Sequence, residues 1–349
     1  MTTKEFGACI TRLIKKHSLT KEEAANCFED ILQNTQSDMQ QGAFLAAITA
    51  KGETAEEIAA AWQAIYDLDT VKVNIDVDRP LVENCGTGMD SIKTFNISTA
   101  ASIVAASDGI PIARHGARAI TSKCGTVDIL EELGINIECS PEVVKKSIES
   151  TGIGIFNGMS PQVHPNALGR ILSQISFGSV LNIAASLANP ALPKMAVRGV
   201  NSPNLLLPAV KTMKEIGYSR ALVVYGESEP GKSGGIDEAS TMGRSHICEL
   251  VDGEISEYII SPEDFGIKTS RASDLIISKD IHAEALRMKS LLTGDDTRER
   301  TDIVCLNAGL ILYVTGSQPN IKDGYERALF LVSTDKPINK LKDWVEAQQ

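Results

Sequence analysis

The sequence predicts an α/β protein in which a small helical domain accompanies a larger α/β domain with a mainly parallel central sheet. Two observations indicate this division. Residues 4–70 have an all-helical pattern, with capping residues ahead of runs of helical periodicity. From Pro80 onward, short apolar runs alternate with helical segments, which is the pattern of a parallel sheet flanked by helices.

Helix starts in the first region follow from polar capping residues. Thr20 with Glu23, and Thr54 with Glu57, have capping-box spacing ahead of apolar-periodic runs. These signals and the apolar spacing predict helices over residues 22–32, 39–50 and 56–68.

The second region alternates strands and helices. Residues 80–82 lead into a Gly-rich turn, and small residues favour a helix over 98–107. The other predicted elements are a strand over 110–113, helices that begin within 128–133 and 141–150, and a buried strand over 220–225. The loop 227–235 follows that strand and is rich in Gly, Ser and Pro, as are many loops that close on ligands.

The composition is ordinary for a globular protein. With 349 residues, 43% of them hydrophobic and 23% charged, the chain can bury a large core and should divide into more than one unit. We find no run of eighteen apolar residues and no signal-peptide pattern, so we expect no membrane association. The seven cysteines are scattered without metal-binding spacing, which favours reduced thiols and a cytoplasmic location.

The net charge of −11 argues against a nucleic-acid partner, because phosphate contacts normally require a basic face. A phosphorylated small molecule would need only a local basic pocket. Arg114, Arg118 and Lys123 are the cations that would have to form it.

Residues 85–128 bring together the groups that hold a heavily phosphorylated ligand. A Gly-rich turn at 86–88 precedes Asp90, and polar residues at 96–99 begin a helix. Cations and hydroxyls follow at 114–123. Backbone N–H groups, hydroxyls and cations of this kind bind phosphates.

Taken singly, each of these features also has a structural explanation. The glycines suit a strand-to-helix turn, and Ser98 and Thr99 suit helix capping. Asp237-Glu238 fits a solvated pair, and a lone histidine such as His115 or His164 is more often structural than catalytic. The functional interpretation depends on the coincidence of the motifs.

This chain resembles the anthranilate phosphoribosyltransferase family, whose motifs usually read GTGGD, NIST, KHGNR and SSKSGSxD. The corresponding residues here are 86–90 (GTGMD), 96–99 (NIST), 114–118 (RHGAR) and 121–128 (TSKCGTVD). Asp237-Glu238 is similar to the family's acidic metal-binding pair. The likeness extends from the helical N-terminus to 306–309 (LNAG).

The resemblance implies a fold like that of nucleoside phosphorylases and phosphoribosyltransferases, with the active site in the cleft between two domains. The helical domain would be discontinuous, comprising 1–72 and 165–188. The α/β phosphoribosyl-binding domain would comprise 73–164 and 189–349.

The resemblance also implies a homodimer through the helical domain. Phe44, Leu45, Ile48 and Trp62 favour such an interface, because a small layer of three helices cannot bury them all alone. The alternative is that these side chains pack on 165–188 within one chain.

The reaction implied by the resemblance is transfer of 5-phosphoribose from phosphoribosyl pyrophosphate (PRPP) to the amine of anthranilate or a related aromatic acceptor, as in tryptophan biosynthesis. Pyrophosphate leaves as positive charge develops on the ribose, so catalysis should be mainly electrostatic and positional. Mg²⁺ would stabilise the pyrophosphate. An aromatic amine is an uncharged nucleophile, so no catalytic base is nominated.

The resemblance assigns residues to three parts of the site. PRPP would be bound by Gly86, Thr87, Asp90, Thr94, Asn96, Ser98, Thr99, Arg114, Arg118, Ser122, Lys123 and Thr126. The metal ligands would be Ser98, Asp237 and Glu238, and the acidic pair should be only modestly buried because it follows a Gly-rich loop. The acceptor would be bound by Gly86, His115, Ala117, His164, Arg170 and Leu172.

The chain departs from the family pattern mainly on the acceptor side. The family's anthranilate-binding Asn and Arg fall on Ala117 and Leu172, and Arg170 replaces that Arg only if the helix shifts. The Gly-Pro of the family's NILGPL element is missing from 182–187 (NIAASL). We therefore expect a retained donor site and an acceptor pocket that is more apolar at its carboxylate end.

Two alternative functions belong to related proteins. Pyrimidine-nucleoside phosphorylases share a close relative of the second motif, but the acidic pair and the 86–99 motif favour the transferase. A non-catalytic, nucleic-acid-binding relative would need a basic groove, which the net charge and the acidic pair contradict.

Overall fold

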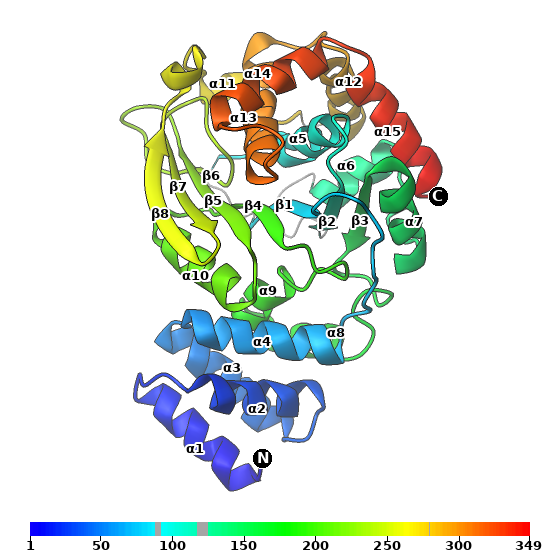
Figure 1. The fold of residues 1–349 in the computed structure, drawn as a ribbon. Helices are drawn as coiled ribbons and strands as arrows, with labels where there is room; N and C mark the ends of the chain where they lie inside the picture. Colours follow the sequence, from blue (N-terminus) through cyan, green and yellow to red (C-terminus); the bar gives the residue numbers. More distant parts are fainter. Residues whose placement is uncertain (88–91, 117–124, 279) are drawn as a thin grey trace.

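The structure, a computed structural model, describes residues 1–87, 92–116, 125–278 and 280–349. A layer of N-terminal helices, blue in Figure 1, adjoins a body in which helices cover a central sheet. The predicted architecture of a small helical domain with a larger α/β domain and a mainly parallel sheet is confirmed.

The N-terminal layer contains α1 (Thr3–Ile14), α2 (Lys21–Leu32), α3 (Asp38–Lys51) and α4 (Ala55–Leu68). The bounds of α2, α3 and α4 lie within one residue of the predicted ones. Both predicted capping boxes are present, with the threonine hydroxyl accepting from the glutamate N–H and the glutamate carboxylate accepting from the threonine N–H. Local capping chemistry therefore sets where these helices begin.

The sheet has the strand order β3-β2-β1-β4-β5-β7-β8, and β6 pairs with β5. The strands that run parallel are β1 (Val82–Gly86), β2 (Ile112–Gly116), β3 (Ile153–Asn157), β4 (Met195–Gly199) and β5 (Arg220–Glu227). The antiparallel strands are β6 (Gly235–Ile236), β7 (Ser245–Val251) and β8 (Glu254–Ile260). The parallel strands end at one common edge of the sheet.

Further helices follow in the chain, and several of them cover the two faces of the sheet. They are α5 (Ile97–Ala106), α6 (Thr126–Glu132), α7 (Pro141–Thr151), α8 (Leu168–Ile175), α9 (Val180–Ala185), α10 (Leu206–Glu215), α11 (Ala272–Leu275), α12 (Ile281–Leu292), α13 (Arg298–Val314), α14 (Ile321–Val332) and α15 (Lys336–Ala347). Side chains alternate along β5, so Leu222 and Val224 join the core under α5 and α13, whereas Ala221 and Val223 join the core shared with the N-terminal layer.

Helices α8 and α9 pack with the N-terminal layer in one apolar core. The Asp69 carboxylate accepts hydrogen bonds from three backbone N–H groups at 166–168, at 2.6–2.9 Å, and so caps α8. The Trp62 indole donates to the Leu187 carbonyl at 2.9 Å. These contacts support a discontinuous helical domain, and its division into 1–72 and 165–188 stays a prediction.

The four apolar residues that favoured a dimer interface are buried within one chain. Phe44, Leu45 and Ile48 have no exposed surface, and Trp62 retains 5%. They share one apolar core with the other N-terminal helices and with residues 167–188, in keeping with the alternative of packing within one chain. The homodimer stays a prediction, but these side chains no longer supply a reason for it.

The carboxyl-terminal residues close the β3 edge of the sheet (Figure 1). The side chain of Gln348 accepts from the Ile155 N–H at 3.1 Å and donates to the Ile155 carbonyl at 3.0 Å. The same side-chain oxygen accepts from the Trp344 indole at 2.9 Å. One amide therefore pairs the backbone groups that an edge strand would otherwise leave open.

We expect Gln348→Ala to lower the free energy of unfolding by about 2 kcal/mol, because it leaves buried donors and an acceptor without partners. Urea denaturation measures this loss. Gln349→Ala is the matched control, since Gln349 is exposed and its replacement should cost less than about 0.5 kcal/mol. Equal losses in the two variants would contradict the role of Gln348.

Candidate active site

The acidic segment 237–238 crosses the sheet where parallel strands β1 and β4 end. Gly86 and Gly199 are register partners at those ends. A Cβ atom on Gly86 would lie 2.0 Å from Asp237 Oδ2, and one on Gly199 would lie 1.5 Å from the Asp237 carbonyl oxygen. Gly199 therefore requires glycine, and a side chain on Gly86 would displace the Asp237 carboxylate from its present position. Ligands of α/β proteins bind at this carboxyl edge of the sheet.

Asn307 on α13 holds the acidic segment in place. Its side chain donates to the Ala239 carbonyl and accepts from the Ala239 N–H, each at 2.9 Å. Asp237 is buried, with 7% of its surface exposed, and Glu238 is half-buried. The expectation of modest burial was wrong for Asp237, because its carboxylate lies against Gly86 and not on a solvated loop.

Arg114 connects the first turn of α5 to this edge. Its Nη1 donates to the Ser98 carbonyl at 2.8 Å and to Ser102 Oγ at 3.0 Å, and its Nη2 lies 3.4 Å from Ser98 Oγ. Burial lowers the pKa of Arg114 to about 10, although neighbouring negative groups, among them Glu238, oppose the shift. The guanidinium stays charged at neutral pH and orders the turn that carries Ser98.

The segment that leads into α5 is anchored from behind. Thr94 forms an antiparallel β-bridge with Ile276, and the side chain of Phe95 is buried. The buried Arg300 guanidinium lies 3.6 Å from the centroid of the Phe95 ring and pairs with Glu284. This cation–π contact fixes the backbone just before Asn96.

Other predicted donor-site residues have definite positions. The Thr87 N–H donates to the Gly199 carbonyl at 3.1 Å, and Thr126 begins α6 beside Gly116, the last residue of β2. Thr99 is fully buried, and its hydroxyl has no hydrogen-bond partner within the described part of the chain. The predicted site residues Asp90, Ala117, Arg118, Ser122 and Lys123 lie outside the described residues.

Two predicted acceptor-site residues, His115 and His164, meet edge to face with ring centroids 5.6 Å apart. Both rings are buried, and the Nε2 atom of each lacks a hydrogen-bond partner among the described residues. Burial lowers the pKa of His115 to about 3, and the charges of His164 and Arg198 add to the shift. Burial also lowers the pKa of His164. The pair is therefore neutral at pH 7.

Of the other described acceptor-site residues, Gly86 lies at the end of β1, and Arg170 and Leu172 belong to the helical layer. Arg170 donates to the Ile31 carbonyl at 2.8 Å and to Gln41 Oε1 at 3.3 Å. Leu172 packs against the same apolar core. These contacts join α8 to α2 and α3, and the replacement of the family's Arg by Arg170 stays a prediction.

Arg198 on β4 is a buried cation that the sequence did not single out. Its Nη1 donates to Cys85 Sγ at 2.9 Å and to the Ser186 carbonyl at 3.1 Å, and its Nη2 donates to Ser186 Oγ at 2.5 Å. The Ser186 backbone also interacts with the His115 ring. Arg198 thus lies beside the histidine pair.

Glu83 on β1 is a buried acid that the sequence also left unassigned. It accepts hydrogen bonds from the Asn189 amide at 3.0 Å and the Tyr218 hydroxyl at 3.1 Å. Burial raises the pKa of Glu83 to about 7, against the influence of Arg198. A signal was available, because Glu83 and Arg198 are single charges inside two short apolar runs that precede glycines.

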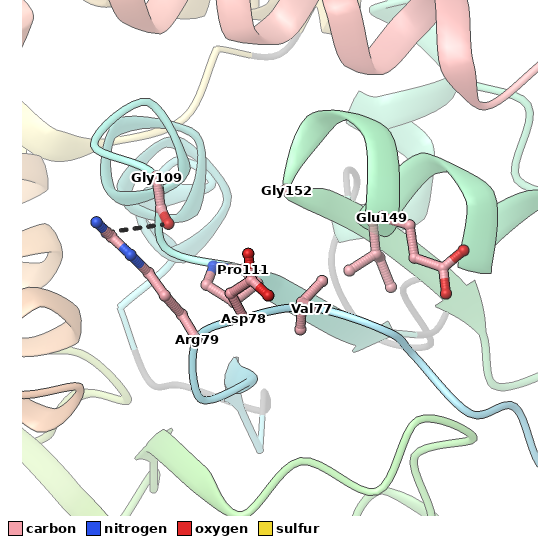
Figure 2. Close-up of a pocket in the computed structure, with 8 residues that line it drawn as sticks. Val77, Asp78, Arg79, Gly109, Pro111, Glu149 and Gly152 are labelled. Carbon is pink, nitrogen blue, oxygen red and sulfur yellow. Dashed lines mark hydrogen bonds between the residues drawn. The ribbon is translucent and has the colours of Figure 1, made fainter.

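Cavities open at the opposite, amino edge of the sheet. Figure 2 shows one of about 230 Å³ that lies ahead of β1, β2 and β3, where Arg79 donates to the Gly109 carbonyl at 3.3 Å. Another, of about 410 Å³, lies ahead of β1, β4 and β5. Neither contains a residue of the site described above.

Two further findings concern metals and membranes. Across 1–87, 92–116, 125–278 and 280–349, no group of three His, Cys, Asp or Glu side chains is arranged to hold a metal ion. Within the same residues, no helix has the length and apolar character needed to cross a membrane.

Known proteins similar to this chain share its whole length. Residues 78–336 match the glycosyl transferase family, a/b domain, and residues 8–68 match the helical bundle domain of the same family. The anthranilate phosphoribosyltransferase of Methanococcoides burtonii is 35% identical over 97% of this chain and 92% of its own length.

Solved structures give the same result. Anthranilate phosphoribosyltransferase from Thermus thermophilus superposes with a TM-score of 0.87 and 29% identity, over 97% of this chain and 99% of that one. The Saccharomyces cerevisiae enzyme in complex with PRPP and Mg shares the fold, with a TM-score of 0.83 and 20% identity over 99% and 98% of the two chains. The chain therefore belongs to the anthranilate phosphoribosyltransferase family of glycosyltransferases.

Proposed function

We propose that this protein transfers 5-phosphoribose from PRPP to the amine of anthranilate or a related aromatic acceptor and releases pyrophosphate. The observation that carries the proposal is the position of Asp237 and Glu238 over the glycine-terminated strands β1 and β4. This position supports a donor site made by the strand ends, the first turn of α5 and the acidic pair.

The donor half would work by position and charge. Gly86 and Thr87 offer backbone groups at the end of β1, and Asn96 and Ser98 offer polar groups at the start of α5. The N-terminus of a helix favours phosphate through its free N–H groups and its dipole. Arg114 would keep that terminus ordered and add a positive charge to the region in which pyrophosphate departs.

The residues present fit a magnesium ion. The Asp237 carboxylate occupies space that a Cβ atom on Gly86 would fill, and the Glu238 charge reaches the guanidinium that binds Ser98. Magnesium favours oxygen ligands and is usually held by one or two carboxylates together with substrate phosphates. Asp237, Glu238 and Ser98 would hold it, and when bound it would stabilise the charge of the pyrophosphate.

The acceptor half would use neutral imidazoles. The buried Nε2 atoms of His115 and His164, which lack partners among the described residues, can accept hydrogen bonds in their unprotonated form. The N–H groups of an aromatic amine are suitable donors. Such contacts would orient the amine toward the ribose without removing its proton beforehand, in keeping with a nucleophile that needs no strong base.

The same observations weigh against the alternatives. A nucleoside phosphorylase uses inorganic phosphate and gives no reason for the acidic pair at this strand edge. A nucleic-acid-binding relative would not benefit from two carboxylates beside the phosphate-binding turn, and the net charge is −11.

We further propose a homodimer and a cytoplasmic location. In the helical part of the chain, Ile14, Met39 and Ile183 expose 66%, 86% and 40% of their surfaces, and exposed apolar side chains of this kind supply interfaces. The cysteines of the described residues are free, as a reducing compartment would keep them.

The double variant Asp237→Asn with Glu238→Gln should reduce PRPP-dependent pyrophosphate release at least about 100-fold, because it removes both charges and keeps both shapes. Titration calorimetry with PRPP and Mg²⁺ should show weakened binding. Asp252→Asn with Glu254→Gln is the control, since this acidic pair lies at the exposed β7–β8 turn. Wild-type turnover by the first variant would overturn the metal assignment.

Replacing His115 should change how stability depends on pH. In the unfolded chain a histidine binds a proton near pH 6.5, whereas folded His115 stays neutral down to about pH 3. Its burial therefore destabilises the fold as pH falls below 6.5. From pH 7 to pH 5, the free energy of unfolding of the wild type should fall by about 2 kcal/mol relative to that of His115→Gln.

Urea denaturation at the two pH values measures this change. His17→Gln serves as the control, because His17 is exposed. The difference in free energy of unfolding between this variant and the wild type should be the same at both pH values. A difference for His115→Gln that does not change with pH would mean that the folded ring titrates normally.

Light scattering at micromolar concentration should give twice the chain mass of 37.4 kDa. Met39→Glu should lower that mass, because a charge is costly in an apolar interface. A wild-type mass equal to one chain would reject the homodimer.

A further inference from the structure

We propose that Arg198 binds the anionic group of the acceptor and makes the enzyme selective for acidic aromatic amines. This inference rests on the proposed function and identifies the cation that the acceptor side requires. Leu172 is apolar, and Arg170 is bound to Ile31 and Gln41 of the helical layer.

Arg198 carries a positive charge in a buried position. Arg198 is 96% buried, since only 4% of its surface is exposed. Its hydrogen bonds go to a thiol, a backbone carbonyl and a hydroxyl, and no carboxylate among the described residues forms an ion pair with it. A guanidinium held in this way lacks a direct counter-ion, and a buried charge is costly until one is supplied.

The nearby carboxyl group of Glu83 balances this charge only in part: burial disfavours the charged guanidinium, whereas Cys85, Glu83 and Tyr218 raise the pKa of Arg198 without a direct ion pair. Glu83 accepts hydrogen bonds from Asn189 and Tyr218 instead of pairing directly with Arg198. Arg114 adds a second buried cation to the same group, and its hydrogen bonds go to Ser98 and Ser102. Glu83 thus acts on two guanidinium groups, and Glu238 acts on Arg114 as well, so Arg198 is the one of the two for which no second carboxyl group is found among the described residues.

Arg198 lies close to the residues proposed to bind the acceptor. Ser186, which accepts hydrogen bonds from both Nη1 and Nη2, lies one residue beyond α9 and contacts the His115 ring through its backbone. Gly199, the next residue along β4, contacts the acidic segment. Arg198 therefore lies between the neutral histidine pair and the donor edge, where the acceptor would have to bind.

The two histidines and Arg198 together suit an acceptor of a particular chemistry. Two uncharged imidazoles accept N–H groups, and one guanidinium binds a carboxylate through two parallel hydrogen bonds. An aromatic ring with an amine beside a carboxylate presents both groups at once. A neutral amine would leave the guanidinium unpaired, so selectivity follows from the cost of that unpaired charge.

Equilibrium binding of two probes tests the inference without relying on turnover. The probes are anthranilate and anthranilamide, which share shape and amine but differ in charge. Wild-type protein should bind anthranilate at least about tenfold more tightly. Arg198→Met should weaken anthranilate at least about 30-fold and leave anthranilamide within about threefold.

Two further variants separate charge from structure. Arg198→Lys should recover part of the preference for anthranilate, because it restores the charge but not the two-pronged geometry. Arg220→Met, which removes a half-buried arginine at the start of β5, should leave both affinities unchanged. Thermal unfolding verifies that each variant is folded.

The outcomes are distinct. If Arg198→Met weakened the binding of anthranilate and anthranilamide to the same extent, Arg198 would have a purely structural role and the inference would be overturned. Equal affinity of the wild type for the two probes would overturn it as well. Titration of the same proteins with PRPP and Mg²⁺ tests the proposed function separately. Failure of PRPP to bind would overturn that function, whereas the anthranilate preference would still decide the role of Arg198.

Discussion

The close passage of residues 237–238 over two strand ends is the constraint on which the site depends. The backbone of Asp237 occupies the place where any side chain on Gly199 would begin, and its carboxylate does the same at Gly86. Backbone atoms cannot move aside as a flexible side chain can, so Gly199 and the acidic segment require one another, whereas a side chain on Gly86 would displace the Asp237 carboxylate. Asn307 then fixes the segment from α13 through two hydrogen bonds to the backbone of one residue, Ala239.

Three buried charged side chains lie in the sheet below the acidic segment, and their desolvation costs free energy. Glu83, Arg114 and Arg198 come from three adjacent parallel strands and point into regions that water does not reach. Apolar residues of similar volume would be at least as stabilising there, because desolvation offsets much of the attraction between charges. Buried charges that folding does not require occur mostly at functional sites, which supports the proposed role of these residues in ligand binding.

The sequence predicted what local chemistry determines. Capping boxes at Thr20 and Thr54 located their helices to within a residue, and the motifs located the strand ends and the turn before α5. The β7–β8 hairpin went unpredicted although Asp252-Gly253, both with positive φ, is the usual sequence sign of such a turn. The contact of Gln348 with Ile155 could not be predicted, because it joins residues 193 positions apart with no pattern in either segment.

The same distinction separates the two halves of the active site. The described donor-side residues belong mostly to one continuous stretch, so a motif recognises them together. The acceptor side joins β2, the loop before α8, the end of α9 and β4, and its members meet only through the fold. Ala117 and Leu172 predicted a pocket that is more apolar at its carboxylate end, whereas the proposed role of Arg198 brings a charge from another strand. A motif therefore transfers the donor chemistry between relatives more safely than it transfers the acceptor, because the acceptor's charge can be supplied from several elements of the same fold.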